Sequence, residues 1–180
     1  TATSESLTQA FLDRIAAIDP RYNAIVFLNP DALADARASD KRRVEGKALG
    51  PLDGVPVVVK ETLDMVGFPT TAGWKLLHAK SGGVDLFPET DSPVVARMKA
   101  AGTVILGKTN VPSLSHTGSH ANDSWAGPTY NSVNREWLPG GSSAGTATAV
   151  GASLAVLGLA EETGGSIQNP ASAQGLPSVK

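Results

Sequence analysis

The feature that most constrains the fold is an apolar run, Val55-Pro56-Val57-Val58-Val59-Lys60. Its β-branched residues do not alternate with polar ones, which is typical of a strand buried on both faces of a sheet. A similar short run, Thr103-Val104-Ile105-Leu106, follows a helical pattern from Pro93 to Ala101. Strands and helices alternate in this way along the chain, so the sequence predicts a layered α/β domain.

Further elements are predicted from periodicity and helix breakers. Ser6 is expected to cap a helix from Leu7 to Ile18, which Asp19-Pro20 ends. A second helix is expected to start after Pro30 and to end at about Gly46.

The second half of the chain has a different character. From Lys108 to Pro139 it is rich in Asn, Ser, Gly, Pro and Thr, which predicts a long irregular segment of the kind that is often functional. Small residues then predict a tightly packed helix over Ala144 to Gly151, and a strand is expected from Leu154 to Leu159.

The composition excludes several classes of function. The chain has 180 residues, a net charge of −2 and no cysteine, so it has no electrostatic footprint for nucleic acid, no disulfide and no thiolate chemistry. The basic cluster Lys41-Arg42-Arg43 is interpreted as a solvated helix face, because Asp40 and Glu45 offset its charge. No stretch approaches the roughly 20 apolar residues that span a bilayer, and Thr1 to Ser6 do not form a signal peptide. We therefore expect no nucleic-acid or membrane partner and a cytoplasmic location.

Two glycine loops carry serines. They are Gly140-Gly141-Ser142-Ser143-Ala144-Gly145 and Thr163-Gly164-Gly165-Ser166. Glycine lets the backbone bend sharply and expose amide groups, and such amides beside a hydroxyl suit attack on a carbonyl and stabilisation of the resulting oxyanion. Taken alone, an ordinary turn or a helix N-cap explains each loop better.

Lys60 is the candidate base for these serines. A lysine base must be neutral, whereas an unperturbed lysine has a pKa of about 10.4. Burial after Val57-Val58-Val59 would disfavour the charged form, and Glu61 is expected to point to the opposite face of the strand. Without the serine loops, a lysine that extends its amine to solvent at the end of a strand would be the better explanation.

A metal site is the alternative that His116 and His120 suggest. Their spacing suits a helix, but Thr117-Gly118-Ser119 between them is poor helix material and contains no catalytic Glu. We interpret them as loop histidines and expect no metal.

Five blocks together resemble the amidase signature family, whose members use a Ser-Ser-Lys triad. The blocks occur in the family's order, and the spacing between Ser142 and Ser166 also fits the family. They are Gly54-Val55-Pro56-Val57-Val58-Val59-Lys60, Pro69-Thr70-Thr71-Ala72-Gly73, Gly107-Lys108-Thr109-Asn110-Val111-Pro112, Pro139-Gly140-Gly141-Ser142-Ser143-Ala144-Gly145, and Thr163-Gly164-Gly165-Ser166-Ile167 with Pro170-Ala171-Ser172.

The resemblance implies a role for each matching residue. Ser166 would be the acylating nucleophile and Lys60 the final base. Ser142, which follows a cis peptide bond from Gly141, would relay a proton between them. The resemblance also implies an oxyanion hole from the backbone amides of Thr163, Gly164, Gly165 and Ser166, and a hydrogen-bond network supported by Ser143.

Several positions depart from the family's usual residues. Glu61 follows Lys60 where relatives commonly have Asp, and Glu161-Glu162 stands where they often have Thr-Asp. Glu162 is expected to take the role of that Asp, whereas Glu161 and Gln168 change the charge near the site.

The family's catalytic domain continues far beyond the block that contains Ser166. The resemblance therefore implies that residues 1–180 are the N-terminal part of a single catalytic domain, incomplete in this chain. Residues 1–50 would be a helical lead-in and residues 51–180 the signature core. The implied fold has three layers, α/β/α, around a mixed central sheet.

The expected activity is hydrolysis of a small-molecule carboxamide to a carboxylate and an amine or ammonia, through a serine acyl-enzyme and without a cofactor. Two alternatives remain open: the glutaminase subunit of a tRNA-dependent amidotransferase, and a non-catalytic relative that binds a ligand. The sequence leaves the substrate and a homo-oligomeric state undetermined.

Overall fold

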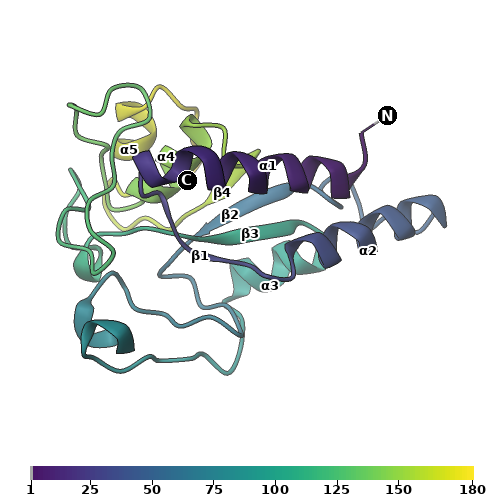
Figure 1. Ribbon diagram of the computed structural model, residues 1–180, viewed down its shortest axis with the longest axis horizontal. Helices are drawn as coiled ribbons and strands as arrows, with labels where there is room; N and C mark the ends of the chain where they lie inside the picture. Colours follow the sequence, from purple (N-terminus) through teal and green to yellow (C-terminus); the bar gives the residue numbers. More distant parts are fainter. Residues whose placement is uncertain (1) are drawn as a thin grey trace.

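A mixed sheet of four strands forms the centre of the computed structural model, which describes residues 2–180 (Figure 1). The strand order is β1-β3-β2-β4, in which β2 runs parallel to both of its neighbours and β1 runs antiparallel to β3. The strands are β1 (Ile25–Leu28), β2 (Pro56–Lys60), β3 (Val104–Thr109) and β4 (Leu157–Leu159). The α-helices are α1 (Ser4–Ile18), α2 (Ala32–Val44), α3 (Pro93–Ala100), α4 (Ala144–Gly151) and α5 (Gln168–Ala173).

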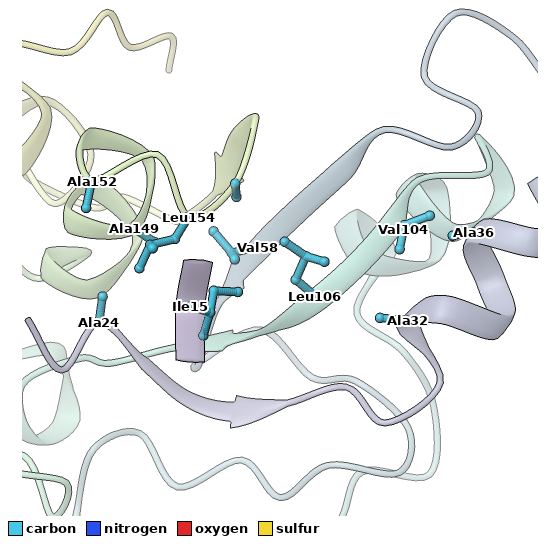
Figure 2. Close-up of a cluster of buried hydrophobic side chains, with 11 residues drawn as sticks. Ile15, Ala24, Ala32, Ala36, Val58, Val104, Leu106, Ala149, Ala152 and Leu154 are labelled. Atoms are coloured by element: carbon cyan, nitrogen blue, oxygen red, sulfur yellow. The ribbon is translucent and has the colours of Figure 1, made fainter. Parts of the chain in front are cut away.

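One face of the sheet packs against α1, α2 and α4. Val58, Val104 and Leu106 project from this face and are fully buried. Ile15 of α1 and Ala149 of α4 belong to the same cluster (Figure 2). Alanines on the helices allow the helix backbones to lie close to the strands.

The opposite face packs against α3. Val57, Val59 and Ile105 point to this side, because successive side chains of a strand alternate between faces. Val95 of α3 is fully buried against them. Helices therefore cover both faces of a mixed sheet, and the predicted three-layer α/β/α fold is confirmed.

Helix α4 has the predicted bounds, and its small residues have a structural reason. A Cβ atom added to Gly145 would lie 2.6 Å from the carbonyl oxygen of Asn110, too close for any side chain. This close packing holds the loop before α4 against the end of β3. The position of Ser142 in that loop is thereby fixed.

Several predicted boundaries are wrong. Helix α1 starts at Ser4 rather than Leu7, because the Thr3 hydroxyl accepts a hydrogen bond from the Ser6 amide and so caps the helix three residues earlier. Strand β3 extends to Thr109, into the segment predicted to be irregular, whereas β4 includes only the second half of the predicted strand. Strand β1 and helix α5 were not predicted.

The basic cluster of α2 is more than a solvated face. The Arg42 guanidinium donates two hydrogen bonds, of 3.1 and 2.6 Å, to the buried carboxylate of Asp53. The Leu49 amide donates a third, of 2.9 Å. These bonds fasten the turn before β2 to helix α2, and the hydrogen bond from Arg42 holds the pKa of Asp53 below its ordinary value.

We expect Asp53→Asn to lower the free energy of unfolding at pH 7 by about 2 kcal/mol, since hydrogen bonds from a cation to a buried carboxylate are lost. Because the folded-state pKa of Asp53 lies below its unfolded value, its contribution is present above a pH of about 4 and is lost as the pH falls. Urea unfolding at several pH values measures this. The variant should match wild type at low pH, and the exposed Asp13→Asn serves as control. An equal loss at every pH would contradict the expectation.

Candidate active site

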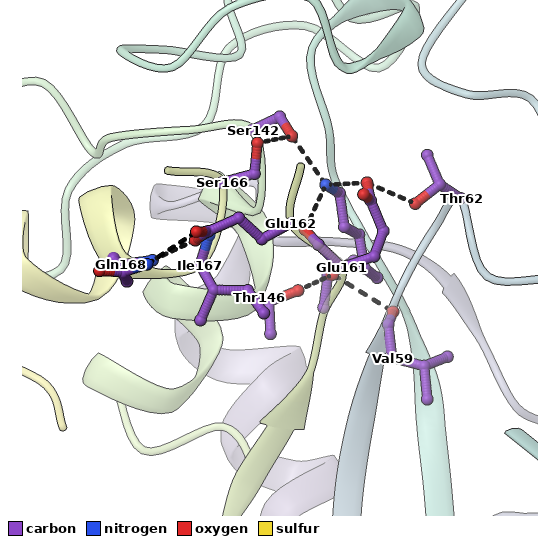
Figure 3. Close-up of polar contacts among 11 residues, drawn as sticks. Val59, Thr62, Ser142, Thr146, Glu161, Glu162, Ser166, Ile167 and Gln168 are labelled. Carbon is purple, nitrogen blue, oxygen red and sulfur yellow. Dashed lines mark hydrogen bonds and ion pairs between the residues drawn. The ribbon is translucent and has the colours of Figure 1, made fainter. Parts of the chain in front are cut away.

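The sheet brings Lys60, Ser142 and Ser166 into one row of hydrogen bonds (Figure 3). Lys60 is the last residue of β2, Ser142 lies in the loop before α4, and Ser166 lies in the loop between β4 and α5. The Lys60 Nζ lies 2.7 Å from the Ser142 Oγ, which lies 2.9 Å from the Ser166 Oγ. Lys60 and Ser142 are fully buried, whereas Ser166 is partly exposed. The row therefore runs from the interior of the fold to its surface.

The peptide bond between Gly141 and Ser142 is cis. Gly141 also lies close to the loop that contains Thr117, since an added Cβ would be 2.7 Å from the Thr117 carbonyl oxygen. Any side chain at this position would displace that loop. Gly141 thus keeps the irregular segment beside the row.

Lys60 has hydrogen-bond acceptors on two sides. Besides Ser142, its amine contacts the carboxylate of Glu161 and, at 3.4 Å, the carbonyl oxygen of the same residue. Burial lowers the pKa of Lys60, and the hydrogen bond to Glu161 opposes that shift. The net direction is downward, toward the neutral amine.

Glu162 holds the loop that carries Ser166. Its Oε2 accepts hydrogen bonds of 2.7 Å from the Ile167 amide and 2.9 Å from the Gln168 amide. These hydrogen bonds keep the pKa of Glu162 below its ordinary value, and the one from the Gln168 amide has the largest effect. The ammonium of Lys180 lies 3.1 Å from its other oxygen. The Glu162 carboxylate therefore bridges the start of the loop and the start of α5.

The loop from Thr163 to Ser166 is open to solvent on one side. A Cβ added to Gly164 would meet nothing within 4 Å, and Gly165 has a φ of +94°, in the region that favours glycine. Among residues 2–180, no backbone or side-chain oxygen accepts a hydrogen bond from the amides of Thr163, Gly164 or Ser166. These three amides therefore make no hydrogen bond within the part of the chain that the structure describes.

Ser143 supports this loop through its backbone. Its amide donates a hydrogen bond of 3.2 Å to the Ser166 carbonyl oxygen. Its buried hydroxyl has no hydrogen-bond partner within the described residues. Ser143 therefore contributes to the link between the two serine loops through its main chain and not through its hydroxyl.

Sequence reasoning missed a second buried lysine. Lys108 is fully buried, with its Nζ 2.9 Å from the Pro69 carbonyl oxygen and 3.9 Å from the carboxylate of Glu61. Burial lowers the pKa of Lys108 and raises that of Glu61. Glu61 points away from Lys60, as expected, and its Oε1 accepts a hydrogen bond of 2.5 Å from the Thr71 amide. A lysine within an apolar strand is the signal that could have revealed this pair.

His116 and His120 are loop residues, as interpreted. His116 is exposed, and its Nδ1 lies 2.6 Å from the Ser113 carbonyl oxygen and 3.6 Å from the Asp123 carboxylate. Within residues 2–180, no three histidine or acidic side chains gather in a way that would hold a metal ion. None of the helices described has the length and apolar character needed to cross a membrane.

Relatives from several bacteria align with almost the whole of this chain. A glutamyl-tRNA(Gln) amidotransferase subunit from Salinispora tropica is 43% identical over 180 residues, which cover 99% of this chain and 35% of that protein. The corresponding subunit from Acidothermus cellulolyticus is 43% identical, and the alignment covers 99% of this chain and 34% of that protein. The chain thus spans about a third of the length of these relatives.

Solved structures agree with the sequence comparison. The native peptide amidase from Stenotrophomonas maltophilia matches with a TM-score of 0.82 and 39% identity, covering 94% of this chain and 35% of that one. An amidase family protein from Bacillus anthracis matches with a TM-score of 0.83 and 31% identity, covering 96% and 35%. The family model described as Amidase matches residues 6–180. This chain therefore belongs to the Amidase family.

Proposed function

We propose that the full-length protein hydrolyses an amide bond of a small, non-peptide substrate through an acyl-enzyme on Ser166. The observation that carries the proposal is the continuous row from Lys60 through Ser142 to Ser166. A serine hydroxyl is a weak nucleophile until a neighbouring base accepts its proton. Lys60 is the basic group in this row, and its burial favours the neutral form that a base requires.

In the proposed first half-reaction, the Ser166 Oγ attacks the amide carbonyl carbon. The Ser166 proton passes to Ser142, whose own proton passes to the neutral Lys60. The oxyanion is bound by the free amides of the loop from Thr163 to Ser166. The proton then returns along the row to the leaving nitrogen, the C–N bond breaks, and an amine or ammonia departs.

In the second half-reaction, water attacks the ester carbonyl on Ser166. The row accepts the water proton and returns it to the Ser166 Oγ as the carboxylate product leaves. The net reaction consumes one water and forms one carboxylate and one amine, so it requires no cofactor.

A fluorophosphonate tests this assignment, because activated serines displace its fluoride and become phosphonylated. We expect one adduct per full-length molecule, located on Ser166 by peptide mass spectrometry, and none in Ser166→Ala. Ser172 is a nearby exposed serine on α5, and the control variant Ser172→Ala should be labelled as wild type is. An unlabelled but folded full-length protein would favour the non-catalytic, ligand-binding alternative.

A second candidate function is supported by the sequence relatives, which are subunits of a glutamyl-tRNA(Gln) amidotransferase. In this case the amide would be that of glutamine, and the ammonia would pass to a partner subunit. Glutaminase activity of the full-length protein that rises strongly only when partner subunits are added would favour it. Hydrolysis of simple aliphatic or aromatic amides by the protein alone would favour the first proposal.

A further inference from the structure

Glu161 lies beside the amine of Lys60 because of the sheet register. Strand β4 runs parallel to β2, with Leu159 opposite Val59, so the chain leaving β4 passes the end of β2. The Glu161 carboxylate there contacts the Lys60 Nζ, and the Thr62 hydroxyl lies 3.4 Å from the same carboxylate oxygen (Figure 3). The Glu161 side chain is 38% exposed, whereas that of Lys60 is fully buried. The carboxylate therefore joins a buried amine to solvent.

The contact with Glu161 bears on the protonation state of Lys60. An ammonium group has three hydrogens to donate. The Lys60 Nζ has acceptors for all of them: the Ser142 hydroxyl, the Glu161 carbonyl and the Glu161 carboxylate. The arrangement thus suits a protonated Lys60 that donates a hydrogen bond to the Ser142 hydroxyl. To activate Ser166, the hydrogen bond must run the other way, from the Ser142 hydroxyl to a neutral Lys60 amine.

The other elements around Lys60 supply few charges. Among the described residues, Glu161 and Glu162 are the carboxylates that act on it, and Glu162 is engaged by the amides of Ile167 and Gln168. Helix α4 and strand β4 contain no charged residue. Lys108 of β3 lies opposite Val59 in the sheet, so its side chain is on the face that packs against α3, away from the Lys60 amine. On that face Lys108 pairs with Glu61.

We propose that Glu161 is a positioning residue that holds Lys60 as an ammonium and so sets the pH above which Lys60 becomes the base for Ser142 and Ser166. The inference rests on the proposed function for its catalytic consequence, but the contact between Glu161 and Lys60 can be tested without it. It also gives a role to a residue at which this chain departs from the family's frequent threonine.

The test uses full-length wild type, Glu161→Gln and Glu161→Thr. Glutamine keeps an acceptor oxygen but removes the charge, so Lys60 should lose its proton at lower pH. We expect a downward shift of about 1 pH unit, at the lower end of the range for a nearby opposite charge because water reaches Glu161. The readout is the titration of the Lys60 ¹³Cε signal in protein labelled at lysine, assigned with Lys60→Arg. Glu45→Gln, which removes an exposed carboxylate that pairs with Lys47, is the matched control and should not shift it.

A second readout is the pH dependence of the rate at which a fluorophosphonate labels Ser166. The rise of this rate with pH should occur at a lower pH in both Glu161 variants, by the same amount as the shift in the Lys60 titration. An unchanged Lys60 titration in these variants would overturn the inference, as would a shift equal to that of Glu45→Gln. If the Lys60 titration shifts but wild type forms no Ser166 adduct, the effect of Glu161 on Lys60 stands, whereas the proposed function and the catalytic consequence of that effect fail.

Discussion

Replacement of Lys60 by Met in the full-length protein is expected to lower kcat/KM for an amide substrate by about 10⁴-fold. Met has a similar length and no amine, so the side chain still fills the buried space at the end of β2 but accepts no proton from Ser142. Because the members of a proton relay act as a unit, adding Ser166→Ala to this variant should cost little more. Steady-state kinetics with the best amide from a substrate screen measures both effects.

The control for this experiment is Lys99→Met, which removes a partly exposed lysine that pairs with Asp91 on the protein surface. Its kcat/KM should remain close to that of wild type. Two separate losses that multiply in the double variant would show that Lys60 and Ser166 act independently, and the relay would then be wrong.

The second large effect concerns stability and the buried pair of Lys108 and Glu61. Lys108→Met is expected to lower the free energy of unfolding by about 3 kcal/mol or more, because it leaves the buried carboxylate of Glu61 without its cation. The double variant Glu61→Gln/Lys108→Met removes that charge as well and should be more stable than Lys108→Met alone. Chemical denaturation of the full-length proteins gives these free energies.

Lys99→Met again provides the comparison, since an ion pair near the surface contributes at most about 1 kcal/mol. A double variant no more stable than Lys108→Met would mean that the lysine acts through its hydrogen bonds to Pro69 and Thr70, not through its charge.

The parts of the fold that the sequence predicts are those encoded locally. The non-alternating run that forms β2 indicates a strand buried on both faces, and the small residues from Ala144 to Gly151 indicate a tightly packed helix. Strand β1 escaped prediction because it has four residues and no alternating pattern. Helix α5 escaped because it has six residues and includes Pro170. Elements this short depend on tertiary contacts more than on propensity.

The site shows the same division. The resemblance named Lys60, Ser142 and Ser166, but no local pattern places residues from β2 and from two distant loops within hydrogen-bond distance. The contact between Glu161 and Lys60 depends on the register of β4 against β2. Likewise, Glu61 and Lys108 meet because β2 and β3 are parallel neighbours with Val59 opposite Lys108. Such pairings are properties of the assembled sheet.

The two ends of the hydrogen-bonded row offer unequal freedom to anyone who redesigns the protein. Lys60 ends β2, which has a strand on each side, so replacing or moving the base disturbs the middle of the sheet. Around Gly164, by contrast, there is room for new side chains. Directed evolution should therefore find new substrate preferences in libraries that vary the loop near Ser166 and the segment near Thr117, while the proton-accepting end stays constant.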